Sequence, residues 1–259
     1  MDYTVLITGA NGLLGRVLSS ILSDCGFSVI STGKGADVLK GQRGCVYEQM
    51  DVTVQQNVEY VLSKYNPDCI INAAALTDVD ACEKNHDLCL SVNTHSISYF
   101  IPFLKQNDVH LIHVSSDFIF DGSCGPYKED DPCDPINYYG VSKLEAEKLI
   151  INNNLKYTIL RTSLLFGKID DKFNFVTWVK SNLENGSKLN IVDDQYRTAT
   201  FVYDLADVIL KVIQKEKYGV YHVSSGEVLS IYQIVCTIAK HYKYNMNFFR
   251  HRCSCFYGV

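Results

Sequence analysis

Three side chains near the middle of the chain have the types and spacing for proton transfer to a carbonyl group. Tyr139 and Lys143 are four residues apart, so in a helix they lie on one face. A tyrosine hydroxyl titrates at about pH 10, but we expect the ammonium one turn away to lower the pKa of Tyr139. Ser116 follows an apolar run and can hydrogen-bond a substrate carbonyl. Together these groups would polarise a C=O bond and protonate its oxygen after hydride reaches the carbon.

The same tyrosine–lysine spacing also occurs in exposed pairs on helix surfaces that have no chemical role. The surrounding sequence favours the chemical interpretation. Ser115 and Ser116 follow the run from Val109 to Val114, which predicts polar groups at the carboxyl end of a central strand. Open α/β sheets bind their ligands at that edge.

A glycine-spaced turn near the N-terminus predicts a phosphate-binding loop. It follows the apolar run Tyr3–Ile7 and precedes a helical pattern, with the spacing G-x-x-G-x-x-G. Gly9 would allow the sharp turn, Gly12 a close approach of the backbone to a pyrophosphate, and Gly15 tight helix packing. The helix N-terminus would then face the phosphates. The residues of this segment that we expect to bind a dinucleotide are Gly9, Asn11, Gly12, Leu13, Leu14, Gly15 and Arg16. A glycine-rich turn without a ligand is the alternative.

The residues after the second predicted strand indicate which dinucleotide is preferred. An NAD site has an acid about 20 residues past the glycines, but none occurs between Phe27–Ser31 and Asp37. Lys34 and Arg16 can instead pair with a 2′-phosphate, so we expect NADPH, with NADH as a possible substitute. The alternative is that both cations are solvated surface charges.

Further cofactor contacts are expected at the ends of the following elements. Asp51 and Val52 end the third strand pattern, and small residues after Cys69–Ile71 would let the backbone approach a flat ligand. Asn93 lies in the middle of a helical stretch from Asn85 to Gln106. An asparagine at such a position can order a water molecule or stabilise a backbone kink near a site. The candidates added here are Asp51, Val52, Ala73, Ala74, Ala75 and Asn93, with Tyr139 and Lys143 beside the nicotinamide ribose.

Strand and helix patterns alternate over the first 160 or so residues, which predicts an α/β fold with a doubly wound parallel sheet of the Rossmann type. We expect residues 1–166 to form this dinucleotide-binding domain. This alternation of strand and helix patterns ends after Gly167. Residues 167–259 are expected to form a small C-terminal substrate lobe interleaved with the last elements of the sheet.

The composition of the 259-residue chain, 47% hydrophobic and 20% charged, fits a globular protein. The net charge of −5 disfavours nucleic acid and anionic membranes as partners. No apolar run approaches the roughly 20 residues of a membrane span. No signal-peptide pattern precedes the first strand, so we expect a cytoplasmic location. The ten cysteines include no C-x-x-C pair, so we expect no metal site, and we interpret Cys253 and Cys255 as part of a frayed terminus.

These motifs together resemble the extended short-chain dehydrogenases/reductases, and among them the dTDP-4-dehydrorhamnose reductase family. The resemblance extends over almost the whole chain. The matching segments are Thr8–Gly15, Asn72–Ala75, Val79–Asp80, Val92–Asn93, Ser115–Gly122, Tyr139–Lys143, Arg161–Ser163, Asn174–Val176, Asp194–Tyr196 and Asp204–Ala206.

The resemblance implies NAD(P)H-dependent reduction of the 4-keto group of dTDP-4-dehydro-6-deoxy-L-mannose, with Ser116, Tyr139 and Lys143 acting on the substrate. The chain is also similar to the regulatory β subunit of methionine adenosyltransferase, which implies a second possibility. Such a subunit binds NADP(H) and serves as the partner of another enzyme. A bifunctional keto-sugar epimerase/reductase is a third. The partners implied are a nucleotide sugar, and either a second copy in a homodimer or a partner enzyme.

Several positions depart from the reductase pattern. Ser116 stands where these reductases mostly have threonine, and Leu164 where they typically have tryptophan. Arg197–Thr200 replaces a Gly-Ser-Pro-Thr type of run. These differences concern the substrate side and leave the identity of the sugar open. We also expect the segment from His251 to Val259 to stop short of the family's usual last segment.

Overall fold

The computed structural model describes residues 3–39, 41–42, 44–168, 174–244 and 249–252. The predictions for Cys253, Cys255 and the end of the chain therefore lie outside the described residues. The chain forms two compact units. One comprises Met1–Thr162 and Tyr203–Val223, and the other comprises Ser163–Val202 and Ser224–Val259.

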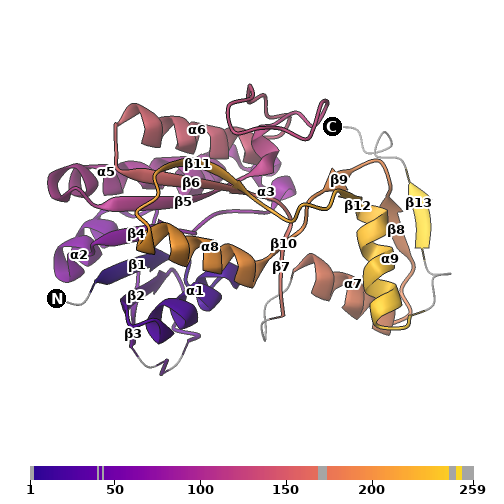
Figure 1. The fold of residues 1–259 in the computed structure, drawn as a ribbon, viewed down its shortest axis with the longest axis horizontal. Helices are drawn as coiled ribbons and strands as arrows, with labels where there is room; N and C mark the ends of the chain where they lie inside the picture. The colour runs from indigo at the N-terminus through magenta and orange to yellow at the C-terminus, as the bar shows by residue number, and fades with distance from the viewer. Residues whose placement is uncertain (1–2, 40, 43, 169–173, 245–248, 253–259) are drawn as a thin grey trace. The chain divides into compact units, whose positions relative to one another are not determined.

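The larger unit is built on a seven-stranded parallel sheet with the order β11-β6-β5-β4-β1-β2-β3 (Figure 1). This sheet confirms the predicted doubly wound α/β fold. Its strands are β1 (Thr4–Thr8), β2 (Ser28–Gly33), β3 (Cys45–Gln49), β4 (Cys69–Asn72), β5 (His110–Ser116), β6 (Tyr157–Thr162) and β11 (Gly219–Val223).

The strands are apolar on both faces because helices cover both sides of a parallel sheet. Alternate strand residues such as Leu6, Ile70 and Leu111 belong to a buried cluster with residues of α2, α5 and α6. Their neighbours in sequence, such as Ile7 and Ile71, are also fully buried. The helices of this unit are α1 (Leu13–Asp24), α2 (Gln55–Tyr65), α3 (Val79–Lys84), α4 (His86–Leu90), α5 (Ser96–Asn107), α6 (Tyr138–Asn152) and α8 (Val202–Gln214).

The predicted helix from Asn85 to Gln106 is wrong in one respect, because it is not continuous. A π-helical segment, η1 (Ser91–His95), separates α4 from α5. Such segments widen a helix by one residue per turn and are frequent at functional sites. Asn93, which we expected near a kink, lies in this segment. A second short element, the 3-10 helix η2 (Asp117–Ile119), follows β5 directly.

The described residues of the smaller unit form short strands, which pair two by two, and two helices. Its core comes from the apolar faces of α7 (Phe175–Glu184) and α9 (Ile231–His241). Both helices begin with a capping box, at Asn174 and at Ser230, which satisfies backbone N–H groups that a helix start leaves open. The paired strands are β7 (Leu165–Phe166) with β10 (Thr200–Phe201), β9 (Tyr196–Arg197) with β12 (Leu229–Ser230), and β8 (Leu189–Val192) with β13 (Phe249–Arg252).

The described residues lack two kinds of feature. No helix in this part of the chain is long and apolar enough to cross a membrane. Within the same residues, no group of three or more histidine, cysteine, aspartate or glutamate side chains is placed to hold a metal ion.

Candidate functional site

The glycine turn after β1 is a tight backbone crossing that only glycine fits. Gly9 has a φ of +67°, and a Cβ atom there would lie 2.8 Å from the backbone of Ala74. A Cβ on Gly15 would lie 2.4 Å from the Gly9 carbonyl oxygen. Gly9 therefore lets the turn approach the segment after β4, and Gly15 lets α1 approach the turn. These two glycines have the structural positions that their spacing predicts.

The N-terminus of α1 offers hydrogen-bond donors to an anion. Its N-cap is Gly12, no side chain caps it, and no acid lies in its first turn. Asn11 Oδ1 is buried without a hydrogen-bond partner, although Asn11 Nδ2 donates to Tyr47 Oη and to the Ala36 carbonyl. Open N–H groups at a helix start and an unsatisfied buried acceptor fit a ligand that carries phosphates and N–H or O–H groups. A dinucleotide is such a ligand. Leu13 and Leu14 are both among the residues expected to bind the dinucleotide. The side chain of Leu14 is buried in the core, so this residue can contact a ligand through its backbone.

Two of the charged residues expected to contact the cofactor, Lys34 and Asp51, lie against each other. Lys34 Nζ is 2.9 Å from Asp51 Oδ2, with the lysine side chain 80% exposed. Burial alone would raise the pKa of Asp51, but hydrogen bonds from Thr53 and Lys34 lower it. Arg16 Nε donates to the Asn11 carbonyl, beside the glycine turn. Val52 is buried in the core cluster.

Asn93 joins the segment after β4 to α6. Its Oδ1 accepts from Leu76 N at 2.7 Å, and its Nδ2 donates to the Leu76 carbonyl and to Ser142 Oγ. The N–H of Ala74 donates to Thr8 Oγ1 at 3.1 Å. The Ala73–Ala75 segment is therefore tied to β1 on one side and, through Leu76, to Asn93 on the other.

The start of α6 lies close to the end of β5. Asn137 caps the helix by accepting from Gly140 N at 2.8 Å. A Cβ on Gly140 would lie 2.1 Å from the Phe118 carbonyl oxygen, so this glycine permits the close approach of α6 to η2. Ser116 is the last residue of β5 rather than the first after it. Tyr139 is buried, and Ser116 lies close enough to influence its pKa, so two of the three predicted catalytic residues are neighbours. Ser116 Oγ itself donates to Asp117 Oδ1 at 3.1 Å.

Lys143, one turn further along α6, is almost fully buried. Its Nζ donates to the Val114 carbonyl at 2.7 Å and lies 3.2 Å from His113 Nε2. The expectation that this ammonium lowers the pKa of Tyr139 is wrong for the protein as it stands. Burial raises the pKa of Tyr139, and the neighbouring Ser116 only partly opposes that rise. The physical reason is that the ammonium is directed at β5.

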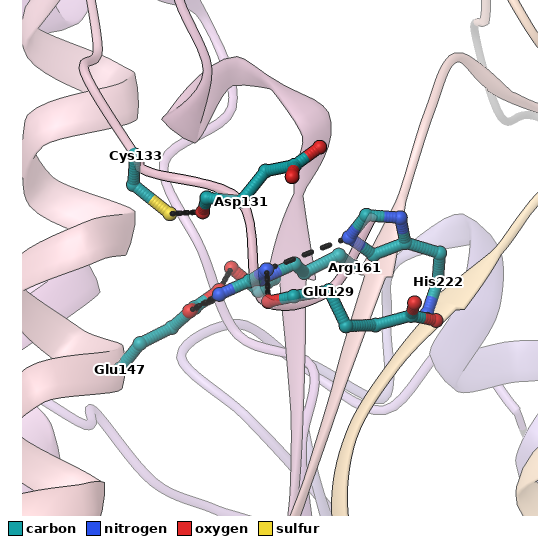
Figure 2. Close-up of polar contacts among 7 residues, drawn as sticks. Glu129, Asp131, Cys133, Glu147, Arg161 and His222 are labelled. Carbon is teal, nitrogen blue, oxygen red and sulfur yellow. Dashed lines mark hydrogen bonds and ion pairs between the residues drawn. The ribbon is translucent and has the colours of Figure 1, made fainter. Parts of the chain in front are cut away.

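A second set of polar side chains beside this site was not predicted. Arg161 and Glu147 form an ion pair of 2.8 Å with side chains 7% and 1% exposed. Arg161 Nη1 donates to the Glu129 carbonyl and lies 3.4 Å from His222 Nε2, so the guanidinium sits between α6 and β11 (Figure 2). Ser115 Oγ donates to Glu147. The pair thus ties the end of β5 to α6 and to the connection before α6.

The sequence carries only a weak signal for the members of this set. A glutamate four residues after Lys143 shares its helix face, and an arginine closing an apolar strand is unusual for a buried position. His113 and Asn72 look like ordinary core residues in apolar runs. Their contacts become visible only once the strand register is known.

The fold and this arrangement define a class, the doubly wound α/β proteins with a tyrosine–lysine helix at the carboxyl edge of the sheet. Comparison with known proteins makes this more specific. Residues 3–252 match the RmlD substrate binding domain family. The chain belongs to this family, which confirms the resemblance seen in the motifs.

Three relatives illustrate the range of the family. A dTDP-4-dehydrorhamnose reductase from Aggregatibacter actinomycetemcomitans is 34% identical over 242 residues, covering 90% of this chain and 77% of its own. The methionine adenosyltransferase 2 subunit beta of Bos taurus is 30% identical over 242 residues, covering 91% and 71%. The crystal structure of dTDP-4-dehydrorhamnose reductase from Bacillus anthracis in complex with NADP is 29% identical, with a TM-score of 0.88 and coverage of 100% and 87%.

Proposed function

We propose that the protein is an NADPH-dependent reductase of the 4-keto group of a nucleotide-activated 4-dehydro-6-deoxy sugar, of the kind used in dTDP-L-rhamnose biosynthesis. One observation carries the proposal. Ser116 and the buried Tyr139 are neighbours at the carboxyl end of β5, and Lys143 is buried one turn further along α6. The family membership and the NADP complex of the B. anthracis relative support it.

The residues have distinct roles in this proposal. Bound NADPH would supply the hydride. Ser116 Oγ would donate a hydrogen bond to the keto oxygen, and Tyr139 would transfer its hydroxyl proton to that oxygen as negative charge develops there. Burial raises the pKa of Tyr139, so the free protein keeps this hydroxyl protonated at neutral pH. The ammonium of Lys143 would bond the nicotinamide ribose and reduce the cost of the tyrosinate that remains.

The cofactor residues proposed for NADPH are those of the glycine turn and the strand ends. The N–H groups at the start of α1 would bond the pyrophosphate, and the buried acceptor of Asn11 would find a donor. Lys34 and Arg16 would pair with the 2′-phosphate. Ala73–Ala75, between the Thr8 and Asn93 contacts, would pass beside the adenosine and ribose.

The test is NADPH oxidation by the full chain against a panel of nucleotide-linked 4-keto-6-deoxy sugars. Tyr139→Phe removes one hydroxyl and keeps the ring, so we expect turnover to fall by roughly 10²–10⁴-fold with little change in NADPH affinity. Tyr138→Phe is the matched control, because that neighbouring ring stacks on His86. A Tyr139→Phe protein with full turnover would show that the proton comes from another group.

A second function, an NADP-binding regulatory subunit, is favoured by the 30% identity to methionine adenosyltransferase 2 subunit beta over 91% of this chain. The two functions give different results in one experiment. A wild-type protein that binds NADPH tightly, turns over no keto sugar, and forms a stable complex with a synthetase would support the regulatory function. In that case Tyr139 and Lys143 would hold the cofactor without acting on a substrate.

A further inference from the structure

The short segment that carries Lys34 is held by side chains of other elements. This Lys34 segment, residues 33–36, starts at the last residue of β2 and continues beyond the sheet. Gln49 Nε2, on β3, donates to the Lys34 carbonyl at 2.8 Å. Asn11 Nδ2, on the glycine turn, donates to the Ala36 carbonyl at 3.0 Å. Two of the four carbonyl groups of the segment are therefore bonded to side chains far away in sequence.

Tyr47, also on β3, lies against the other two carbonyl groups. Its hydroxyl donates to the Gly35 carbonyl at 2.6 Å, lies 3.2 Å from the Gly33 carbonyl oxygen, and accepts from Asn11 Nδ2 at 2.9 Å. A Cβ on Gly33 would lie 2.9 Å from the Tyr47 hydroxyl oxygen, so the backbone passes close to it. Burial raises the pKa of Tyr47, which Asn11 partly opposes, so the hydroxyl keeps the hydrogen that it donates.

Asn11 connects the Lys34 segment to the candidate dinucleotide site. The two hydrogens of its NH₂ group are both used, one by the Ala36 carbonyl and one by the Tyr47 hydroxyl. Turning the amide over would break both bonds, so its orientation is fixed. The oxygen of the same amide is the buried acceptor that has no partner in the free protein. One side chain thus bonds the segment and leaves an open position for a ligand at the glycine turn.

The hydrogen bonds of the backbone are what can hold Lys34 in place. Glycines flank this lysine on both sides, and glycine loses more conformational freedom on ordering than any other residue. The Lys34 side chain is 80% exposed and pairs with Asp51. An exposed ion pair of this kind contributes little to order. A charge that is already positioned binds an anion more tightly, because less freedom is lost on binding.

We propose that Tyr47 is a positioning residue for the choice of cofactor, whose hydroxyl holds the Lys34 segment where the lysine meets the 2′-phosphate of NADPH. The inference rests on the proposed function only for its cofactor, because binding can be measured without turnover. NADH lacks the 2′-phosphate and has no use for Lys34. Tyr47 should therefore matter for NADPH and hardly for NADH.

Fluorescence titration of the full chain with NADPH and with NADH tests this difference. Tyr47→Phe removes the hydroxyl and keeps the ring, while Asn11 retains its bond to the Ala36 carbonyl. We expect NADPH affinity to fall by about three- to tenfold, the effect of one net hydrogen bond, and NADH affinity to change by less than about twofold. A purely structural role would weaken both cofactors alike.

Tyr65→Phe is the matched control. Its hydroxyl donates to Glu48 Oε2 at 2.7 Å, and the side chain of Glu48 lies on the opposite face of β3 from that of Tyr47. This variant also removes one hydrogen-bonded hydroxyl beside β3, but not one that bonds the Lys34 segment. Both of its affinities should stay within about twofold of wild type.

The double variant of Tyr47→Phe with Lys34→Ala shows whether the tyrosine acts through the lysine. It should bind NADPH no more weakly than Lys34→Ala alone, because the segment then has no charge to position. Losses that multiply would give Tyr47 a separate role and overturn the proposal. An unchanged NADPH affinity in Tyr47→Phe, an equal loss for NADH, or an equal loss in Tyr65→Phe would overturn it as well.

If Tyr47→Phe does not fold, Gln49→Met decides. This change removes the bond to the Lys34 carbonyl from an exposed side chain. We expect it to weaken NADPH and not NADH, and an unchanged preference for NADPH overturns the proposal.

Binding and turnover together separate this inference from the proposed function. A wild type that prefers NADPH but reduces no keto sugar refutes the reductase, while the selective loss in Tyr47→Phe still supports the inference. A wild type that reduces a keto sugar with NADPH, and whose preference survives Tyr47→Phe, refutes the inference alone. A wild type that binds NADH as tightly as NADPH refutes the proposed cofactor and the inference with it.

Discussion

The buried pair of Glu147 and Arg161 offers the clearest test of what stabilises the site. Arg161 donates through Nε and Nη2 to the Glu147 carboxylate, at 2.8–3.2 Å (Figure 2). Glu147→Gln removes the negative charge and leaves the guanidinium buried. Its remaining hydrogen-bond acceptors are then the Glu129 carbonyl, the His222 ring and one amide oxygen.

The size of the effect follows from burial. Two unit charges about 4 Å apart interact by about 4 kcal/mol at an effective dielectric constant of about 20. Breaking a buried pair by removing one partner typically costs about 3–5 kcal/mol. We therefore expect Glu147→Gln to lower the free energy of unfolding by about 3 kcal/mol or more. This is a large part of the roughly 5–15 kcal/mol that stabilises a typical domain.

Urea unfolding at pH 7, followed by fluorescence and circular dichroism, measures this free energy. Glu145→Gln is the matched control on the same helix, because Glu145 pairs with Lys148 at 2.8 Å and both side chains are about half exposed. That change should cost less than about 1 kcal/mol. The double variant Glu147→Leu with Arg161→Met leaves no unpaired charge, so it should recover most of the lost stability. Equal effects of Glu147→Gln and Glu145→Gln, or a double variant as unstable as the sum of its singles, would refute the reasoning.

Two further predictions concern the cofactor loop. Gly15→Ala should unfold at a lower urea concentration and lose NADPH affinity at least tenfold, because its Cβ would lie 2.4 Å from the Gly9 carbonyl oxygen. Gly35→Ala is the control, because the nearest atom to its Cβ would be 3.9 Å away. Equal behaviour of the two variants would contradict the prediction. Lys34→Ala should weaken NADPH by roughly three- to tenfold and NADH little, since one exposed charge-assisted pair is worth about 1 kcal/mol. Fluorescence titration measures both affinities, and an equal loss for NADH would show that Lys34 does not read the 2′-phosphate.

The parts of the fold that could be predicted from sequence are those fixed by local patterns. The apolar runs of β1, β4 and β5 and the turn glycines Gly9 and Gly15 each mark their own position in the chain. Tyr139 and Lys143 share a face because helix geometry alone decides it. None of these inferences needs knowledge of a partner distant in sequence.

What could not be predicted depends on register and on packing between distant segments. The direction of the Lys143 ammonium depends on His113, 30 residues away, and that position looks like any histidine in an apolar strand. The break in the long helix lies at Asn93, whose side chain bonds Leu76 and Ser142. A helical pattern in sequence does not show such contacts.

The two unpredicted sets of polar residues have a common origin in the sheet register. His113 and Ser115 are two residues apart on β5, so their side chains lie on the same face of the sheet. The register continues one row from His113 to Asn72 and Thr8, and the other from Ser115 to Arg161 and His222.

Helix α6 bonds both rows, through Lys143 to His113 and through Glu147 to Ser115 and Arg161. Buried polar groups are costly unless they are paired. A shift of α6 by one residue would separate both lysine and glutamate from their partners at once. The two rows therefore fix the position of the helix that carries Tyr139, and this fixed position is what the proposed proton transfer from Tyr139 requires.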